Sequence, residues 1–178
     1  NLLFIMCDDL RPEMSIYGRS FMHTPNFERL ANKSVTFDYA FTHISVCNPS
    51  RDALLTGLRP DTNGNFNFQR SWSPHLILPT QLARSGYNTA QVGKIMHWDG
   101  NNKDVWSFSS FENGWYDYQG KEWTWMNSSV MPNKQPIEKF RDYEFTTKAI
   151  ETLDKLLNAP KYFMLAVGFK LPHLTIDV

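Results

Sequence analysis

A thiol, a proline and an arginine lie close together in the run from Cys47 to Arg51 (CNPSR), where the sequence predicts the start of a helix. Pro49 suits the first helical turn, because its fixed φ and missing N–H are harmless there, and Gly57 suits the left-handed position just past the end. Cys47 would then face unpaired backbone N–H groups and the positive end of the helix dipole, which stabilise anions. The run predicts a nucleophile at position 47; a redox centre and a structural helix-capping cysteine are the alternatives.

Two adjacent carboxylates, Asp8 and Asp9, directly follow the apolar run 1–7 (NLLFIMC). Such a run is typical of a strand buried on both faces. Where the chain leaves the strand, both carboxylates can turn toward one point, and oxygen ligands suit Ca²⁺ or Mg²⁺ rather than zinc. The pair therefore predicts a divalent-metal site, and the alternative is a solvated turn.

Basic side chains follow two further predicted strands. Lys94 and His97 follow a strand at 87–92, and His173 follows a strand at 161–169. Lysine can hold an anion as a point charge, and imidazole can move a proton near neutral pH. Because open α/β sheets bind ligands at the carboxyl ends of their strands, one shared site is expected. The alternative for each residue taken alone is a solvated or structural role.

The stretch from Cys47 through Gly57 resembles the signature of the sulfatase family, Cys-x-Pro-Ser-Arg followed by Leu-Thr-Gly. In that family the cysteine is oxidised after translation to formylglycine. The resemblance implies an aldehyde hydrate at position 47, one of whose hydroxyls attacks the sulfur of a sulfate ester. It also implies a formylglycine-generating enzyme as a maturation partner, and Arg51 as the group that stabilises the charges at position 47.

The resemblance extends to the metal site. Asp8 and Asp9 stand where sulfatases have the pair that binds the divalent metal, usually calcium, together with an oxygen of the formylglycine at position 47. It therefore implies Ca²⁺ in preference to Mg²⁺. The family takes further ligands, an Asp and an Asn or His, from much later in the chain. This sequence ends before them, so a C-terminal portion or a second chain is expected to complete the site.

The remaining site residues also match the family's pattern. Lys94 and His97 resemble the segment that flanks the formylglycine, where the lysine holds sulfate and the histidine moves a proton. His173 matches the histidine of a Lys-Pro-His tip, which contacts sulfate and protonates the leaving oxygen. Lys170 lies one place before the position of that lysine, and a strand would turn it to the other face. Position 170 is therefore given no role.

The spacing points to one branch of the family. Two residues separate Lys94 from His97, where many sulfatases have one, and this spacing resembles the iduronate 2-sulfatase branch. The runs 9–12 (DLRP) and 57–62 (GLRPDT) resemble the same branch. By this analogy the substrate is a sulfated sugar or glycosaminoglycan.

Composition excludes several other functions. The chain has 178 residues, 42% hydrophobic and 20% charged, enough for one domain with a real core. Its formal net charge of +0 gives no long-range field that would attract nucleic acid or an anionic membrane. No run approaches the roughly 20 apolar residues that span a bilayer. The two cysteines allow at most one disulfide.

Two segments, 32–34 (NKS) and 127–129 (NSS), have the form of glycosylation acceptors. They fit an exported glycoprotein, and with the family resemblance we expect a lysosomal, secreted or periplasmic protein. The chain opens on a strand-like run without a basic leader, so any signal peptide would precede Asn1.

The order of the predicted elements is that of an α/β fold with a largely parallel sheet between helices. By resemblance it is alkaline-phosphatase/sulfatase-like and incomplete at its C-terminal side. A short helix capped by Thr24 and an alternating strand at 35–41 precede the helix at Cys47. A helix at 79–85 follows, and the helix at 141–157 carries an apolar stripe formed by Ala149, Ile150, Leu153, Leu156 and Leu157.

Aromatic residues crowd the segment 101–135, where periodicity fades. This segment predicts a long loop or an insertion within a single catalytic domain, 1–178. Its rings could stack on sugar faces, but they more often give an irregular segment a small core of its own.

Three functions remain open. The first is a sulfatase. The second is a phosphoryl or phosphonate monoester hydrolase of the same superfamily, which would keep the metal site and use an unmodified nucleophile. The third is a catalytically incomplete fragment that binds sulfated glycans without turnover. The third interpretation rests on the absence of half of the expected metal ligands, so the chain alone is expected to be inactive.

Overall fold

The computed structural model describes residues 1–68, 77–97, 105–111 and 136–173. Four parallel strands form one sheet in the order β1-β4-β2-β3. The strands are β1 (Leu2–Cys7), β2 (Asn88–Gly93), β3 (Ser109–Phe111) and β4 (Phe163–Phe169). The predicted parallel sheet between helices is confirmed.

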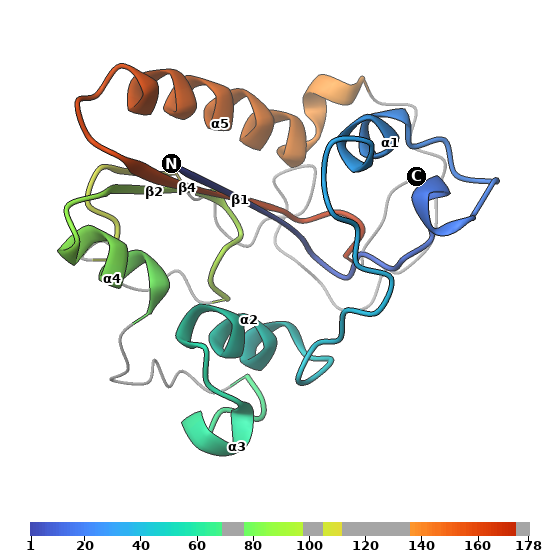
Figure 1. Cartoon of the computed structure of the whole chain (residues 1–178), viewed down its shortest axis with the longest axis horizontal. Coiled ribbons are helices and arrows are strands. Elements are labelled where there is room, and N and C mark those ends of the chain that lie inside the picture. The colour runs from blue at the N-terminus through green and yellow to red at the C-terminus, as the bar shows by residue number, and fades with distance from the viewer. Residues whose placement is uncertain (69–76, 98–104, 112–135, 174–178) are drawn as a thin grey trace.

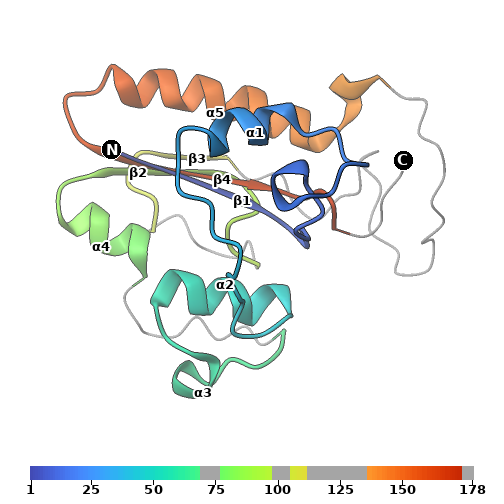
Figure 2. The same ribbon diagram turned by 45° about the vertical axis from the view of Figure 1, so that its right-hand side comes forward.

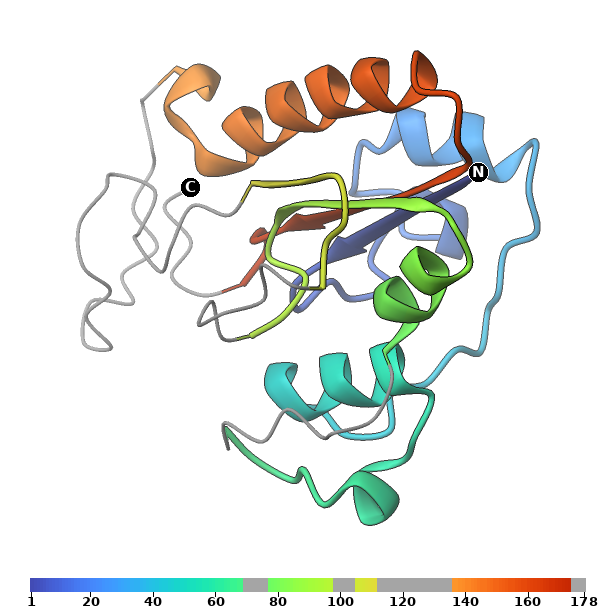
Figure 3. The same ribbon diagram turned by 90° about the vertical axis from the view of Figure 1, so that its left-hand side faces the viewer.

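Helices cover both faces of this sheet (Figure 1). Helix α5 (Arg141–Leu157) lies on one face, and α2 (Cys47–Thr56) and α4 (Leu78–Arg84) lie on the other. Figure 2 and Figure 3 show the same layers from two other directions, with α3 (Pro60–Asn63) beyond α2 and farthest from the sheet. The remaining short elements are α1 (Pro25–Ala31) and the 3-10 turns Ser15–Tyr17 and Ile137–Lys139. Among the described residues, no helix has the length and hydropathy needed to cross a membrane.

Each face of the sheet has its own apolar core. On the α5 side, Phe145 is fully buried against a cluster that includes Val92 and Leu165. On the α2 and α4 side, Leu55 and Ile95 belong to a second cluster. Alternation along β4 sends neighbouring side chains to opposite clusters. Along β2, Ala90 and Val92 join the α5-side cluster, and the alternate Thr89 and Gln91 are also buried, so both central strands are buried on both faces.

Strand β1 corrects one expectation. Its run was predicted to be buried on both faces, yet Leu3 is 51% and Ile5 is 56% exposed. Phe4 and Met6 point the other way and pack against the α2-side cluster. Helix α5 contacts β2 and β4, and within the described residues β1 pairs only with β4. One face of β1 is therefore uncovered in the described chain.

Two further expectations near the N-terminus are wrong. The segment 35–41 alternates like a strand but forms none, and its residues are exposed. Thr24 does precede α1, but its side chain makes no cap bond there. Its hydroxyl instead bonds the backbone N–H and the hydroxyl of Ser15, at 3.1 and 2.7 Å.

Two expectations about the C-terminal half are partly right. Helix α5 has the predicted bounds, and Leu153 packs on the sheet, but Ile150 and Leu157 are 56% and 59% exposed. Of the aromatic segment 101–135, residues 105–111 are described. There Trp106 packs in the α2-side core and β3 pairs with β2. Residues 112–135 lie outside the described part, and the single-domain interpretation stays a prediction.

Candidate active site at the strand ends

Asp8, directly after β1, is the centre of a buried charge cluster. Its Oδ1 lies 3.1 Å from Nη2 of Arg51, and its Oδ2 pairs with Nζ of Lys94. All three side chains are about 5% exposed. Burial alone would raise the pKa of Asp8, but the charges of Arg51 and Lys94 outweigh it and hold this pKa below its ordinary value. The carboxylate is therefore charged and fixed between two cations.

Asp9 turns its carboxylate toward the same region. Its φ of 57° is in the left-handed region, which aspartate tolerates better than most residues. Nε2 of His173 lies 4.0 Å from Oδ2 of Asp8 and 3.9 Å from Oδ2 of Asp9. The turn that ends β1 thus brings both carboxylates to face one imidazole nitrogen.

Arg51 connects α2 to the turn after β2. Its Nη1 donates to the backbone oxygens of Lys94 and Ile95, at 2.6 and 3.0 Å. Helix α2 begins at Cys47 and ends at Gly57, whose φ of 70° confirms the predicted left-handed C-cap. Helix α2 therefore holds the guanidinium of Arg51 against the turn that follows β2.

Two glycines bring Lys94 into the cluster. A Cβ on Gly168 would lie 1.9 Å from the backbone oxygen of Lys94, and a Cβ on Gly93 would lie 2.2 Å from the oxygen of Gly168. The backbone N–H of Lys94 donates to that same oxygen at 2.9 Å. Only glycine permits so close an approach of the ends of β2 and β4. Sequence analysis missed this pair, although glycines at two strand ends were its visible signal.

His97 is buried beside the cluster, at 6% exposure, with its ring centroid 5.1 Å from that of Phe68. Burial, and then the charges of Lys94 and Arg51, lower the pKa of His97 to about 4. Its imidazole is therefore neutral at neutral pH. It can accept a proton there, but it contributes no positive charge.

Cys47 is the first residue of α2 and is partly buried. Burial raises the pKa of its thiol, although Lys94 and Arg51 act in the opposite direction. The helix-end argument alone favoured an anion, but desolvation is the larger effect here. In these surroundings the encoded thiol loses its proton less readily than an ordinary cysteine.

The structure places the predicted site residues in one region. Asp8, Arg51, Lys94 and His173 are linked by the distances above, and Asp9 faces His173. Charges of this cluster also act, after burial, on the pKa values of Cys47 and His97. Their catalytic and metal-binding roles stay predictions.

The fit to a divalent ion is incomplete. Asp8 and Asp9 present hard oxygen donors to one region, as Ca²⁺ or Mg²⁺ requires. In the described part of the chain, however, no group of three or more His, Cys, Asp or Glu side chains could hold a metal ion. Since Ca²⁺ takes six to eight oxygen ligands, the carboxylate pair can form only one side of such a site.

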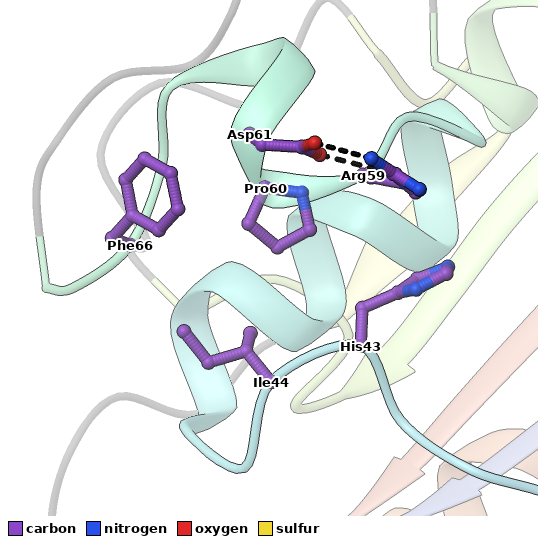
Figure 4. Close-up of a pocket in the computed structure, with 6 residues that line it drawn as sticks. All are labelled: His43, Ile44, Arg59, Pro60, Asp61 and Phe66. Atoms are coloured by element: carbon purple, nitrogen blue, oxygen red, sulfur yellow. Dashed lines mark hydrogen bonds and ion pairs between the residues drawn. The ribbon is translucent and has the colours of Figure 1, made fainter.

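A separate cavity of about 340 Å³ lies beside α2 (Figure 4). His43 and Ile44 line it from the segment before α2, and Pro60 and Phe66 line it from the α3 region. None of its lining residues is a predicted site residue. Its ionic group, Arg59, is bonded to Asp61 in the same wall, as Figure 4 shows.

Comparison with known proteins settles the family. The sequence profile of the family described as Sulfatase matches residues 1–175. The chain belongs to the sulfatase family. One relative is mouse iduronate 2-sulfatase, 34% identical over 98% of this chain. Another relative is N-acetylglucosamine-6-O-sulfatase from Bacteroides thetaiotaomicron, 31% identical over 97%. The chain spans only 35% and 30% of the lengths of these two enzymes.

Solved structures agree with this sulfatase fold. One is a protein bound to its substrate D-glucosamine-2-N,6-O-disulfate, with a TM-score of 0.68 and 26% identity over 98% of this chain and 35% of that one. Another is the phosphonate monoester hydrolase of Agrobacterium radiobacter, with a TM-score of 0.71 and 19% identity over 97% of this chain and 41% of that one. At that identity the second likeness concerns the fold alone.

Proposed function

We propose that the full-length product of this gene is a sulfuric ester hydrolase that removes sulfate from a sulfated sugar or glycosaminoglycan, in the manner of iduronate 2-sulfatase. The observation that carries this proposal is the convergence of Arg51, Lys94 and His173 on Asp8, in a cluster whose charges also act on Cys47. A sulfate monoester needs its anionic oxygens neutralised and its leaving alkoxide protonated. Family membership and the named sugar sulfatases among the relatives support the same reaction.

Each residue has a role that its environment favours. Arg51 and Lys94 are fixed cations in a buried site, so they can stabilise negative charge on sulfate without reorganisation. His97 is proposed to accept a proton from the attacking group, although its pKa of about 4 makes it a weaker base than the near-neutral imidazole that the sequence predicted. His173, with a 24% exposed side chain, can reach the ester oxygen and protonate it as it leaves.

Position 47 would supply the nucleophile as formylglycine rather than as a thiolate. The raised pKa of the Cys47 thiol supports a precursor role for the encoded cysteine. A hydrated aldehyde would provide an oxygen nucleophile and a further oxygen ligand near Asp8. Its formation requires a formylglycine-generating enzyme as maturation partner.

Asp8, Asp9 and the oxygen at position 47 would hold Ca²⁺, with Mg²⁺ as the alternative ion. When bound, the ion would supply positive charge to the sulfate oxygens. The remaining ligands would come from polypeptide beyond these residues, either a C-terminal portion or a second chain. The length of the relatives, about three times the matched part, supports this division.

We further propose an exported glycoprotein in the lysosome, the periplasm or the extracellular space. Asn32, the first residue of the acceptor segment 32–34, is exposed at the end of α1. The second acceptor, at 127–129, lies outside the described residues. Digestion of the native protein with a glycosidase, followed by mass measurement, tests this proposal.

Sulfate release from a panel of sulfated sugars by the full-length, formylglycine-bearing product tests the main proposal. We expect release from at least one sugar sulfate and none from the Cys47→Ala variant. Lys148→Ala, an exposed change on α5 that removes an ion pair with Glu151, is the matched control and should retain activity.

The second candidate is a phosphoryl or phosphonate monoester hydrolase. Its support is the fold likeness to the phosphonate monoester hydrolase. Assays with 4-nitrophenyl sulfate and with 4-nitrophenyl phenylphosphonate, a phosphonate monoester, distinguish the two functions. A preference for the phosphonate by a protein with unmodified Cys47 would favour this candidate over the sulfatase.

A third candidate binds sulfated glycans without turnover. It would be a fragment or a degenerate relative that lacks the remaining metal ligands, since the described residues supply only one side of a metal site. Calorimetry with Ca²⁺ and a sulfated disaccharide on the full-length product separates the cases, since binding of the sugar with no sulfate release would favour the non-enzymatic function.

A further inference from the structure

Asp142 connects α5 to the segment that carries His173. It is the second residue of α5, yet its carboxylate does not cap that helix. Oδ1 accepts the backbone N–H of Lys170, and Oδ2 accepts the backbone N–H of Leu171, each at 2.9 Å. Both carboxylate oxygens are thus used by consecutive residues just past β4.

The same segment ends in the candidate acid. The backbone N–H of His173 donates to the oxygen of Lys170 at 2.9 Å. Lys170 is therefore held by Asp142 at its N–H and by His173 at its carbonyl. This chain of bonds runs from α5 to the imidazole that lies about 4 Å from Asp8 and Asp9.

A carboxylate that accepts two backbone N–H groups is a strong, directional anchor, because charge-assisted bonds are roughly twice as strong as neutral ones. Helix α5 is itself anchored by Phe145, which is fully buried in the core on that face. The turn from Lys170 to His173 follows the end of β4, and the two bonds to Asp142 tie it to α5. A displacement of about 1 Å at a catalytic group can lower a rate about 100-fold.

We propose that Asp142 is a positioning residue for His173, which it holds at the acidic pair through the Lys170–His173 turn. This proposal rests on the proposed sulfatase function for its catalytic consequence. It assigns no contact between Asp142 and substrate.

The test compares leaving groups in the full-length enzyme. If His173 protonates the leaving oxygen, its correct position matters for a sugar sulfate and little for 4-nitrophenyl sulfate, whose leaving group needs no proton. Asp142→Asn should lower kcat/KM roughly 10- to 100-fold on the sugar sulfate and much less on the aryl sulfate. Asp142→Glu, which keeps a carboxylate, should restore part of the loss. Asp154→Asn, an exposed carboxylate on the same helix, should change neither.

A double-variant cycle separates positioning from a general loss of structure. Asp142→Asn combined with His173→Ala should be no worse than His173→Ala alone, because the first change acts only through the second residue. Additive losses, or equal losses on both substrates, would overturn the proposal.

Hydrogen exchange provides a readout that does not depend on activity. In the wild type, the peptide covering 169–173 should exchange slowly at the two amides bound to Asp142, and Asp142→Asn should accelerate them. Unchanged exchange would also overturn the proposal. If the wild type hydrolyses no sulfate ester but exchange responds as expected, the sulfatase function fails while the anchoring by Asp142 stands.

Discussion

Two arginine–carboxylate pairs in this chain have opposite surroundings. Nη2 of Arg51 lies 3.1 Å from Oδ1 of Asp8, and Arg59 binds Asp61 through Nε, 3.1 Å from Oδ1, and through Nη2. The first pair is about 5% exposed, whereas the side chains of the second are 67% and 54% exposed. Burial removes the water that would otherwise screen the charges. The charges of the first pair are therefore fixed and poorly screened, and the second is an ordinary surface pair.

Removal of the central carboxylate should have the largest effect. Asp8→Ala leaves Arg51 and Lys94 buried without their anion, and we expect the free energy of unfolding to fall by about 3–5 kcal/mol. Urea denaturation of the full-length protein measures it. Asp61→Ala is the matched control in the exposed pair. If Asp8→Ala lowers the free energy of unfolding no more than Asp61→Ala does, burial does not distinguish the two pairs.

Lowering the pH should destabilise the folded protein, because the buried His97 resists protonation. Its folded pKa of about 4 lies below the ordinary 6.5, so the unfolded chain binds more protons between these values. Neutral His97 therefore contributes fully to the free energy of unfolding above pH 6.5. This contribution, at most about 3 kcal/mol, is lost as the pH falls to 4. Thermal unfolding from pH 7 to pH 4 should show a steeper decline for the wild type than for His97→Gln. Parallel curves would show that His97 titrates normally.

The glycine contact behind Lys94 should matter more for activity than for stability. Gly168→Ala would force the ends of β2 and β4 apart, at about 1–3 kcal/mol, and displace Lys94, with roughly a 100-fold loss of kcat/KM. Gly64→Ala is the control: Gly64 has a φ of 77° and open space around its Cβ position. It should lose comparable stability but no activity. Equal activity of Gly168→Ala and Gly64→Ala would show that Gly168 does not position Lys94 for catalysis.

The exposed pair of Arg59 and Asp61 should contribute least to stability. Arg59→Ala breaks a contact that water and salt already screen, so we expect no measurable change in the unfolding midpoint. The lowered pKa of Asp61, caused chiefly by its hydrogen bond with Arg59, should return to its ordinary value, which NMR titration of the carboxyl detects. A clear loss of stability would mean that the pair supports the nearby cavity more strongly than its exposure implies.

The sequence predicted most of the elements that position the site, because each carries a strong local signal. The apolar runs before Asp8 and His173 and the amphipathic pattern of 141–157 correspond to β1, β4 and α5. The alternation of apolar and polar residues at 35–41 wrongly predicted a strand. A strand also needs a pairing partner, and the described chain offers none there.

The contacts that fix the site could not be predicted. The Asp142 anchor joins residues 28 and 29 positions apart, and the fit of Gly168 against Lys94 depends on how β2 and β4 approach each other. The raised pKa of the Cys47 thiol depends on burial by distant segments, which the helix-end pattern does not contain.

The central claim is that Cys47 is the precursor of an oxygen nucleophile for sulfate ester hydrolysis. Intact mass and sulfate release, measured on the same full-length protein made with and without a formylglycine-generating enzyme, test it most directly. We expect a mass lower by the difference between a –CH₂SH and a –CHO side chain, and sulfate release in proportion to the converted fraction. Full activity of the protein with unconverted Cys47 would contradict the claim.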